Sequence, residues 1–584
     1  MQKAPSLIRT RGGFSIVEAL LAGSIFALLV TALVGAYLYG QEATMLAGNR
    51  ARAVLLAEEG MDAAQNIRDA AFTNLVDGTY GLTTTGNQWN LSGSSDSTDL
   101  FTRTVTVATI DGYRKRVTTA VNWQQNAQRT GTVVLDAYLS YWQRIVSVAT
   151  GGILVYGDGT TIPKYRNYDV TANTFGAETS TTTGDLSSTA IMRVSPNSTQ
   201  AVAGFVTPTG SLNVMCFDGS AWTLDWTVSL GDTSSARRFD IAYETGSGDA
   251  MVLYSRGVGT TDELGYRTKA GGSACGSANW SAVTTFDPVR TSGVVHYVRL
   301  AWDRRAGQNL IAASWIDAND DLSAAIWSGT AWGNEPAAVS DVNVQRIAAS
   351  HDIENFDLDY ESLSGDVMLV WGTTVGNGVN GVRYRTCTGG ISACAWSATT
   401  TPPTFLDDAT SLDLSANPNA DQMVFASVGR NQNDLQIGYW SGTAWTNTAN
   451  VDTSCNPVIA GAKQIATGWL ISGATTRSVV IYGDQGSNRI DWYAGNAGVF
   501  TFQADIVMVP ATNNPYRWVD IQMNPMSKDM LMYCYADSNS DLYCKRLVMT
   551  ATPVFTWTDS DGAALNVTLP QTIASPFSFA FWRN

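Results

Sequence analysis

The chain has little charge for its size, and most of that charge is acidic. Only 15% of its 584 residues are charged, with 36 lysines and arginines against 51 aspartates and glutamates, for a net charge of −15. There is no run of like charge and no heptad pattern. Because binding to nucleic acid needs a basic patch, we expect no nucleic-acid partner.

Histidine is nearly missing, since His296 and His351 are the only two. No nucleophile motif accompanies them, so the sequence does not support a Ser-His-Asp triad. A carboxylate pair that hydrolyses glycosides stays open, because any acid can face a cleft. We predict that the protein is not an enzyme and keep a polysaccharide-acting enzyme as an alternative.

Cysteine is absent from the first 215 residues, and seven cysteines follow. Two close pairs straddle apparent turns and lack the spacing of zinc knuckles, so we predict disulfides, as in an extracytoplasmic protein: Cys387 with Cys394 and Cys534 with Cys544. One further pair is possible among three cysteines that the sequence leaves unassigned: Cys216, Cys275 and Cys455.

A long apolar run stands near the N-terminus. Residues 14–39 hold one side chain that is charged at neutral pH, Glu18, and as a helix they would reach ~39 Å, enough to span a bilayer. Lys3, Arg9 and Arg11 precede the run and favour a cytoplasmic N-terminus. A carboxylate inside a membrane is costly, so Glu18 is expected to have a function.

The stretch "GGFSIVEALLAGSIFALL" resembles the N-terminus of type IV prepilins and type II secretion pseudopilins, with Gly13, Phe14 and Glu18 in register. The resemblance implies a leader peptide at 1–13, cleavage after Gly13 by a prepilin peptidase, and methylation of Phe14. It also implies insertion in the cytoplasmic (inner) membrane and later assembly with other pilin subunits. There, Glu18 would pair with the α-amino group of a neighbour's Phe14, a contact that sets register more than stability.

The pilin resemblance covers 14–143. We expect a transmembrane or filament-core helix over 14–39, its amphipathic continuation over 40–74, and an antiparallel sheet over 101–142, with a loop at 81–99. This is an α+β pilin module, with a long helix packed on a small sheet.

The remaining chain, 144–584, repeats. "FDGSAW" (217–222) and "WSGTAW" (327–332 and 440–445) recur, and short alternating strands such as "FDIAYETGSGD" (239–249) and "FDLDYESLSGD" (356–366) return about every 50 to 60 residues. Each unit predicts four short strands. Such sheets must stack to bury both faces, which favours an all-β propeller of eight blades, with seven as the alternative. We expect the C-terminal strand 577–584 to close the ring.

Two acidic turns fall at the same place in their repeats, and Asp-x-Asn-x-Asp loops can bind calcium. A solvated hairpin turn is the simpler interpretation, because Asp and Asn tolerate turn geometry. No other cofactor is expected. The possible calcium ligands are Asp317, Asn319, Asp321, Asp537, Asn539 and Asp541.

Together these features predict a type IV pilus subunit, a minor pilin that displays a large extracellular propeller at or near the filament tip. The propeller would serve adhesion, with a surface glycan or protein as its ligand. A major subunit whose propellers coat the shaft is the first alternative, and a pseudopilin-linked enzyme is the second.

Overall fold

The computed structural model describes residues 15–582 except 71, 112–113, 127–128, 141–150, 161, 183–188, 232–236, 290, 292, 337–353, 374–378, 403–404, 406, 430–433, 447–449, 453–454, 456–462, 484–488, 505, 508–515, 538–539, 561–566, 568 and 570–574. The chain divides into two compact units, residues 1–145 and 146–584. Each is described by itself.

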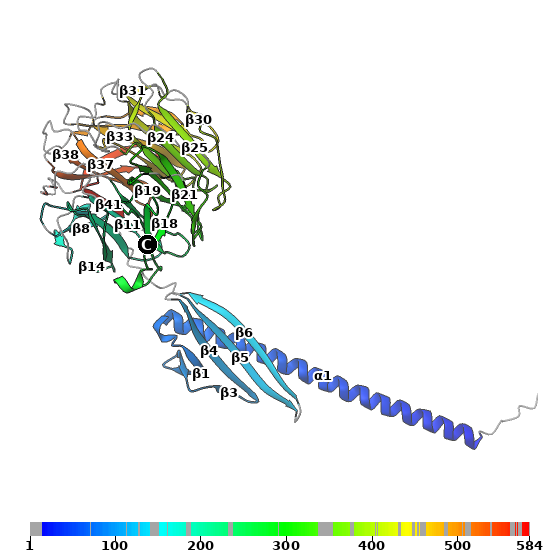
Figure 1. Ribbon diagram of the computed structural model, residues 1–584. Helices are drawn as coiled ribbons and strands as arrows, with labels where there is room; N and C mark the ends of the chain where they lie inside the picture. Colours follow the sequence, from blue (N-terminus) through cyan, green and yellow to red (C-terminus); the bar gives the residue numbers. More distant parts are fainter. Residues whose placement is uncertain are drawn as a thin grey trace, which may run out of the picture. The chain divides into compact units, whose positions relative to one another are not determined.

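The first unit is built on one long helix, α1 (Ile16–Ala70) (Figure 1). A short 3-10 helix, η1 (Phe72–Asn74), follows it. Six strands form a single sheet in the order β2-β1-β4-β5-β6, with β3 paired to β4. They are β1 (Gly78–Thr85), β2 (Gln88–Ser92), β3 (Asp96–Thr98), β4 (Phe101–Asp111), β5 (Arg114–Asn126) and β6 (Arg129–Ser140).

The second half of α1 packs on this sheet, while the first half is exposed. Ala53, Ala57, Ala64 and Ile67 are buried against strands β4 and β5. Gly60 lets the helix approach closely, because a Cβ there would lie 2.5 Å from Cγ2 of Thr119. By length and composition α1 can cross a membrane, and none of its apolar N-terminal stretch is buried by the residues that the structure describes.

The prediction of a loop at 81–99 is wrong, because β1, β2 and β3 occupy most of that stretch. Gly86 and Asn87 have positive φ angles of 60° and 63°, which is the geometry of a tight hairpin turn. They join β1 to β2, with Thr85 opposite Gln88. The polar, threonine-rich composition hid these strands.

The second unit consists, among the described residues, of eight antiparallel sheets of four or five strands. The first contains β7 (Gly151–Tyr156), β8 (Lys164–Asp169), β9 (Thr174–Phe175), β10 (Thr179–Ser180) and β41 (Phe577–Phe581). The second contains β11 (Thr189–Val194), β12 (Ala201–Val206), β13 (Ser211–Phe217) and β14 (Trp222–Ser229). The third contains β15 (Phe239–Tyr243), β16 (Ala250–Ser255), β17 (Leu264–Lys269) and β18 (Thr284–Phe286), with η2 (Ser277–Asn279) between the last two.

The fourth sheet contains β19 (Val295–Trp302), β20 (Ile311–Asp317), β21 (Leu322–Trp327) and β22 (Trp332–Gly333). The fifth contains β23 (Phe356–Tyr360), β24 (Val367–Gly372), β25 (Val382–Thr388) and β26 (Ala395–Trp396). The sixth contains β27 (Ala409–Ala416), β28 (Met423–Gly429), β29 (Leu435–Trp440), β30 (Trp445–Thr446) and β31 (Asn450–Asp452).

The seventh sheet contains β32 (Ile465–Ser472), β33 (Thr475–Gly483), β34 (Arg489–Asn496), β35 (Val499–Phe502) and β36 (Ile506–Val507). The eighth contains β37 (Tyr516–Met523), β38 (Met530–Asp537), β39 (Leu542–Met549) and β40 (Phe555–Asp559).

These sheets form a β-propeller. The innermost strands β11, β15, β19, β23, β27, β32, β37 and β41 each contact the next, and β41 also contacts β11. Eight buried apolar clusters join the sheets, and each cluster takes its residues from two neighbouring sheets. Because both faces of a sheet are covered, second strands such as β12 and β16 read as continuous apolar runs instead of alternating.

The two ends of the unit meet in one sheet. Strand β41 pairs with β7, so that Phe579 lies opposite Leu154. Strand β7 therefore has an innermost neighbour from the far end of the chain.

Candidate functional site

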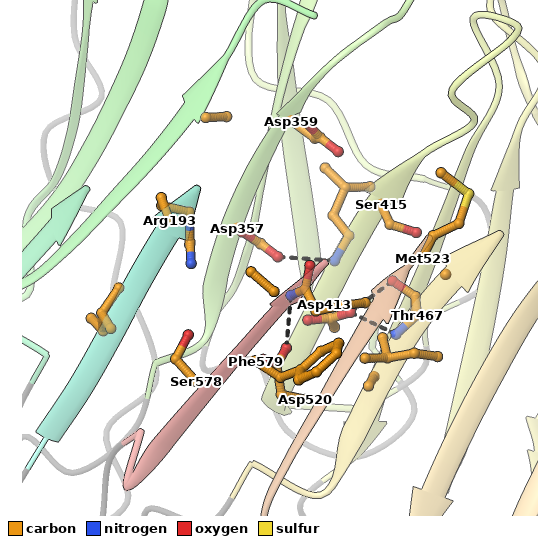
Figure 2. A pocket seen from close by; sticks show the side chains of 18 of the residues that line it. Arg193, Asp357, Asp359, Asp413, Ser415, Thr467, Asp520, Met523, Ser578 and Phe579 are labelled. Carbon is orange, nitrogen blue, oxygen red and sulfur yellow. Dashed lines mark hydrogen bonds between the residues drawn. The ribbon is translucent and has the colours of Figure 1, made fainter. Parts of the chain in front are cut away.

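Polar side chains gather where the innermost strands of the propeller face one another. Each of these eight strands contributes a charged or hydroxyl side chain to this inner layer, which Figure 2 shows in part. They are Arg193, Asp240, Arg299, Asp357, Asp413, Thr467, Asp520 and Ser578.

The acids among them tie neighbouring strands together. Asp240 accepts a hydrogen bond from the Leu300 backbone N–H at 2.9 Å, and Asp357 accepts one from Leu414 N–H at 3.1 Å. Asp413 accepts hydrogen bonds from the backbone N–H and the hydroxyl of Thr467, each at 2.7 Å. Neighbouring innermost strands share no ladder, so these carboxylates satisfy N–H groups that would otherwise be buried unpaired.

Ion pairs reinforce the layer. Arg237 lies 2.7 Å from Asp240, while Arg193 lies 3.4 Å from the same carboxylate. Burial raises the pKa of Asp240, but the nearby arginines outweigh burial and hold it below its usual value. For Arg193 burial dominates instead, and its pKa is lowered. Asp240 is therefore a fixed anion that orients two guanidinium groups.

Asp357 behaves differently from Asp240. Arg299 lies 3.1 Å away, and Asp413 adds a second negative charge nearby. Burial is the largest influence, and the pKa of Asp357 is raised to about 6 despite the attraction of Arg299. The negative charge of Asp413 is met by Lys463 at 2.5 Å.

A cavity of about 350 Å³ lies along these strands and is lined by Arg193, Asp357, Asp413 and Asp520 among others. In Figure 2 Asp357, Asp413 and Asp520 come from three different strands and approach a common space, with Arg193 and Ser578 on the other side. The volume falls at the lower end of the range for ligand pockets. This polar cavity, which we call the channel, has fixed hydrogen-bond donors and acceptors in its wall. It is our candidate site.

These residues were not predicted from the sequence. Their signal was an isolated aspartate inside an apolar first strand, as in "FDIAY", "FDLDY" and "VDIQM". Only the ring arrangement brings these distant positions together.

The repeated "WSGTAW" phrases have a structural role between sheets. Trp327 Nε1 donates to Glu244 at 2.7 Å, and Trp440 Nε1 donates to Glu361 at 2.5 Å, each across the boundary between neighbouring sheets. Burial raises the pKa of Glu244 and raises that of Glu361 to about 6. We call these two contacts the Trp–Glu latches.

The acidic turns act as hairpin turns. Asp317 accepts the backbone N–H groups of Asn319 at 2.8 Å and Asp321 at 3.1 Å, and Asp537 accepts that of Asp541 at 2.9 Å. Asn539 lies outside the described residues. The part of the chain that the structure describes contains no group of three acidic, histidine or cysteine side chains arranged for a metal. Calcium binding stays a prediction.

At the N-terminus Glu18 is exposed and caps its own helix. Its carboxylate accepts the Ser15 backbone N–H at 3.1 Å, and Ser15 Oγ accepts the Val17 N–H at 3.2 Å. This reciprocal pattern is a capping box. Gly13 and Phe14, the predicted processing residues, lie outside the described residues.

The structure contains three disulfides: Cys387–Cys394, Cys534–Cys544 and Cys216–Cys275. The first two are the close pairs expected from spacing. The sequence left the third pairing open, because Cys216 and Cys275 are 59 residues apart and meet only where neighbouring sheets stack. Cys455 is buried and in no disulfide. The disulfides and the apolar helix indicate membrane anchoring or secretion.

His296 is buried in β19, away from the cavity lining, and His351 lies outside the described residues.

No family model and no curated protein matches this chain. Among solved structures, the BP39L lectin from Burkholderia pseudomallei is 15% identical over 63% of this chain and 98% of the lectin, with a TM-score of 0.44. The Aleuria aurantia lectin, solved with α-methyl-L-fucoside, is 11% identical over 55% of this chain and 94% of the lectin, with a TM-score of 0.30. The polysaccharide lyase Uly1 is 9% identical over 64% of this chain and 90% of the lyase, with a TM-score of 0.37. Similarities this weak do not identify a ligand or an activity.

Proposed function

We propose that this chain is a type IV pilin-like subunit that displays an eight-bladed propeller outside the cell for recognition of a glycan. The observation that carries the proposal is the division of α1 into two halves. One half is buried on its own sheet, and the other is exposed and begins with an apolar stretch, up to Tyr39, that holds a single carboxylate, Glu18.

An exposed apolar helix of this length needs a bilayer or the helices of other subunits around it. The "GGFSIVE" segment adds the chemistry for leaving the membrane, because cleavage after Gly13 would free the amino group of Phe14. A neighbour's Glu18 would then pair with that amino group during assembly.

Eight sheets joined by eight apolar clusters support the count of eight blades. This propeller unit spans residues 146–584, and the helix-bearing unit only 1–145. A head of that size favours a low-copy position at or near a filament tip over the regular shaft. Glycan recognition is supported by the polar cavity and its fixed hydrogen-bonding groups.

The test is the amount of this protein in filaments sheared from cells, measured by immunoblot. We expect Glu18→Ala to remove it from the sheared fraction while it accumulates in the membrane. Glu42→Ala, on the same exposed helix but outside the capping box, is the matched control and should behave as wild type. Equal recovery of wild type and Glu18→Ala in the sheared fraction would contradict the assembly role.

A further inference from the structure

The channel of the propeller is nearly balanced in charge. Six cations lie in its lining, and six carboxylates lie in the lining or directly behind it. They are Arg193, Arg237, Arg299, Arg304, Lys463 and Lys528 against Asp240, Glu354, Asp357, Asp359, Asp413 and Asp520.

Most of these charges are already paired within the wall. Arg304 holds Asp359 through two contacts of 3.0 and 3.1 Å, and Asp359 also accepts the Ala416 backbone N–H at 2.9 Å. Ion pairs likewise engage Arg193, Arg237, Arg299 and Lys463. A charged ligand would have to compete with these partners, and breaking a buried pair is expensive.

Asp520 and Ser415, two polar residues in the lining, can each form further hydrogen bonds. Asp520, on β37, has one hydrogen bond in the described structure, from Gln522 Nε2 at 3.2 Å, and no cation within ion-pair distance. Ser415 Oγ, on β27, is buried and has no hydrogen-bond partner among the described residues. Strands β27 and β37 both contact β32, so the two groups flank that strand.

The charges around Asp520 argue against a cation as its partner. Lys463 and Arg193 already act on this carboxylate, although burial keeps its pKa raised. A cationic ligand would be repelled by both of these side chains, and an anionic ligand would be repelled by Asp357 and Asp413. A hydroxyl group carries no charge and both donates and accepts, so it can bridge an acceptor such as Asp520 and a donor such as Arg193.

We infer that the channel binds a neutral, polyhydroxylated ligand of about the size of one or two sugar rings, with Asp520 and Ser415 as its hydrogen-bonding partners. This inference rests on the proposed glycan recognition and assigns it a place and a ligand class. The binding residues are then on the innermost strands, and the outer surfaces of the sheets take no direct part.

The test uses the full-length protein in a zwitterionic detergent without a sugar headgroup. Saturation-transfer NMR screens five neutral sugars, glucose, galactose, mannose, fucose and N-acetylglucosamine, beside two charged ones, glucosamine and N-acetylneuraminic acid. Titration calorimetry then measures the affinity of each sugar that binds. The variants are Asp520→Asn and Ser415→Ala, and Asp529→Asn is the matched control in the turn between β37 and β38, outside the lining.

We expect at least one neutral sugar to bind, with an affinity about tenfold lower in Asp520→Asn, lower by a smaller factor in Ser415→Ala, and unchanged in Asp529→Asn. If Asp520→Asn does not fold, as judged by near-UV circular dichroism, Ser415→Ala still decides the place. If neutral sugars bind wild type and both channel variants equally, the ligand does not bind at Asp520 and Ser415, but the proposed function stands. Binding of only the charged sugars would overturn the ligand class. If no sugar binds the wild type, glycan recognition itself fails, and this inference fails with it.

Discussion

Trp440 Nε1 donates a hydrogen bond of 2.5 Å to the carboxylate of Glu361, although the two residues belong to different sheets of the propeller. The same carboxylate accepts the Ser364 hydroxyl at 2.5 Å. The equivalent pair, Trp327 and Glu244, joins another two sheets. These latches anchor the outer part of one sheet to the turn that follows the innermost strand of its neighbour.

Removing the indole donor should weaken the propeller. Trp440→Phe leaves Glu361 buried without that hydrogen bond, and we expect it to cost about 1–3 kcal/mol in the free energy of unfolding. Trp445→Phe, in the same "WSGTAW" phrase, is the matched control, because its indole N–H has no partner among the described residues. Thermal melting monitored by fluorescence compares the two variants. Equal melting temperatures would show that the hydrogen bond adds nothing.

The latch should also depend on pH. Burial raises the pKa of Glu361 from 4.5 to about 6, so the folded state binds its proton more tightly than the unfolded state. The contribution of this group to stability is therefore full below about pH 4.5 and is lost as the pH rises through about 6.

Glu361→Gln removes this titration. We expect the variant to gain stability relative to wild type between pH 4.5 and 7, by at most about 2 kcal/mol. Denaturant titrations of both proteins at several pH values measure the difference. A difference that is constant with pH would mean that Glu361 does not titrate in this window.

The disulfides should differ in their effect on stability. Cys216–Cys275 closes a loop with a sequence separation of 59, and Cys387–Cys394 one of 7. The loss of loop-closure entropy predicts that replacing the first pair by serine costs about 2 kcal/mol more than replacing the second. Denaturant unfolding of the two double variants tests this. Alkylation of the denatured, unreduced protein should modify one cysteine of seven, and two or more would contradict the pairing.

Closure of the ring should be a main source of stability. Phe579, on β41, is 2% exposed and contacts the rings of Tyr168, Phe175 and Phe581. We expect Phe579→Ala to cost about 3–5 kcal/mol. Phe502→Ala, at a position that is 47% exposed, is the control and should cost far less. Similar melting temperatures for the two variants would contradict ring closure by β41.

Local patterns were enough to predict several elements of this fold. The apolar run and the alanine-rich stretch after it predicted α1, and the repeated phrases predicted four-stranded units. The strands within 81–99 were not predicted, because they are short and polar apart from Leu82, Trp89 and Leu91. Their place is set by the pairing of β1 with β4 and by a Gly-Asn turn.

The candidate site was not predicted from the sequence, for a different reason. Asp240, Asp357, Asp413 and Asp520 stand one or two repeats apart, and nothing in the local sequence shows that their side chains share one cavity. The pairing of Cys216 with Cys275 was equally out of reach, because it depends on how neighbouring sheets stack. Such contacts can be identified only when the arrangement of the sheets in the ring is known.

Electron cryo-microscopy of filaments sheared from cells that make this protein tests the central claim most directly. The account predicts propellers singly at filament ends, and their loss in a Glu18→Ala strain. Propellers at every helical repeat would identify a major subunit and contradict the tip position. Filaments that lack the propeller in wild-type cells would contradict the pilin-like role altogether.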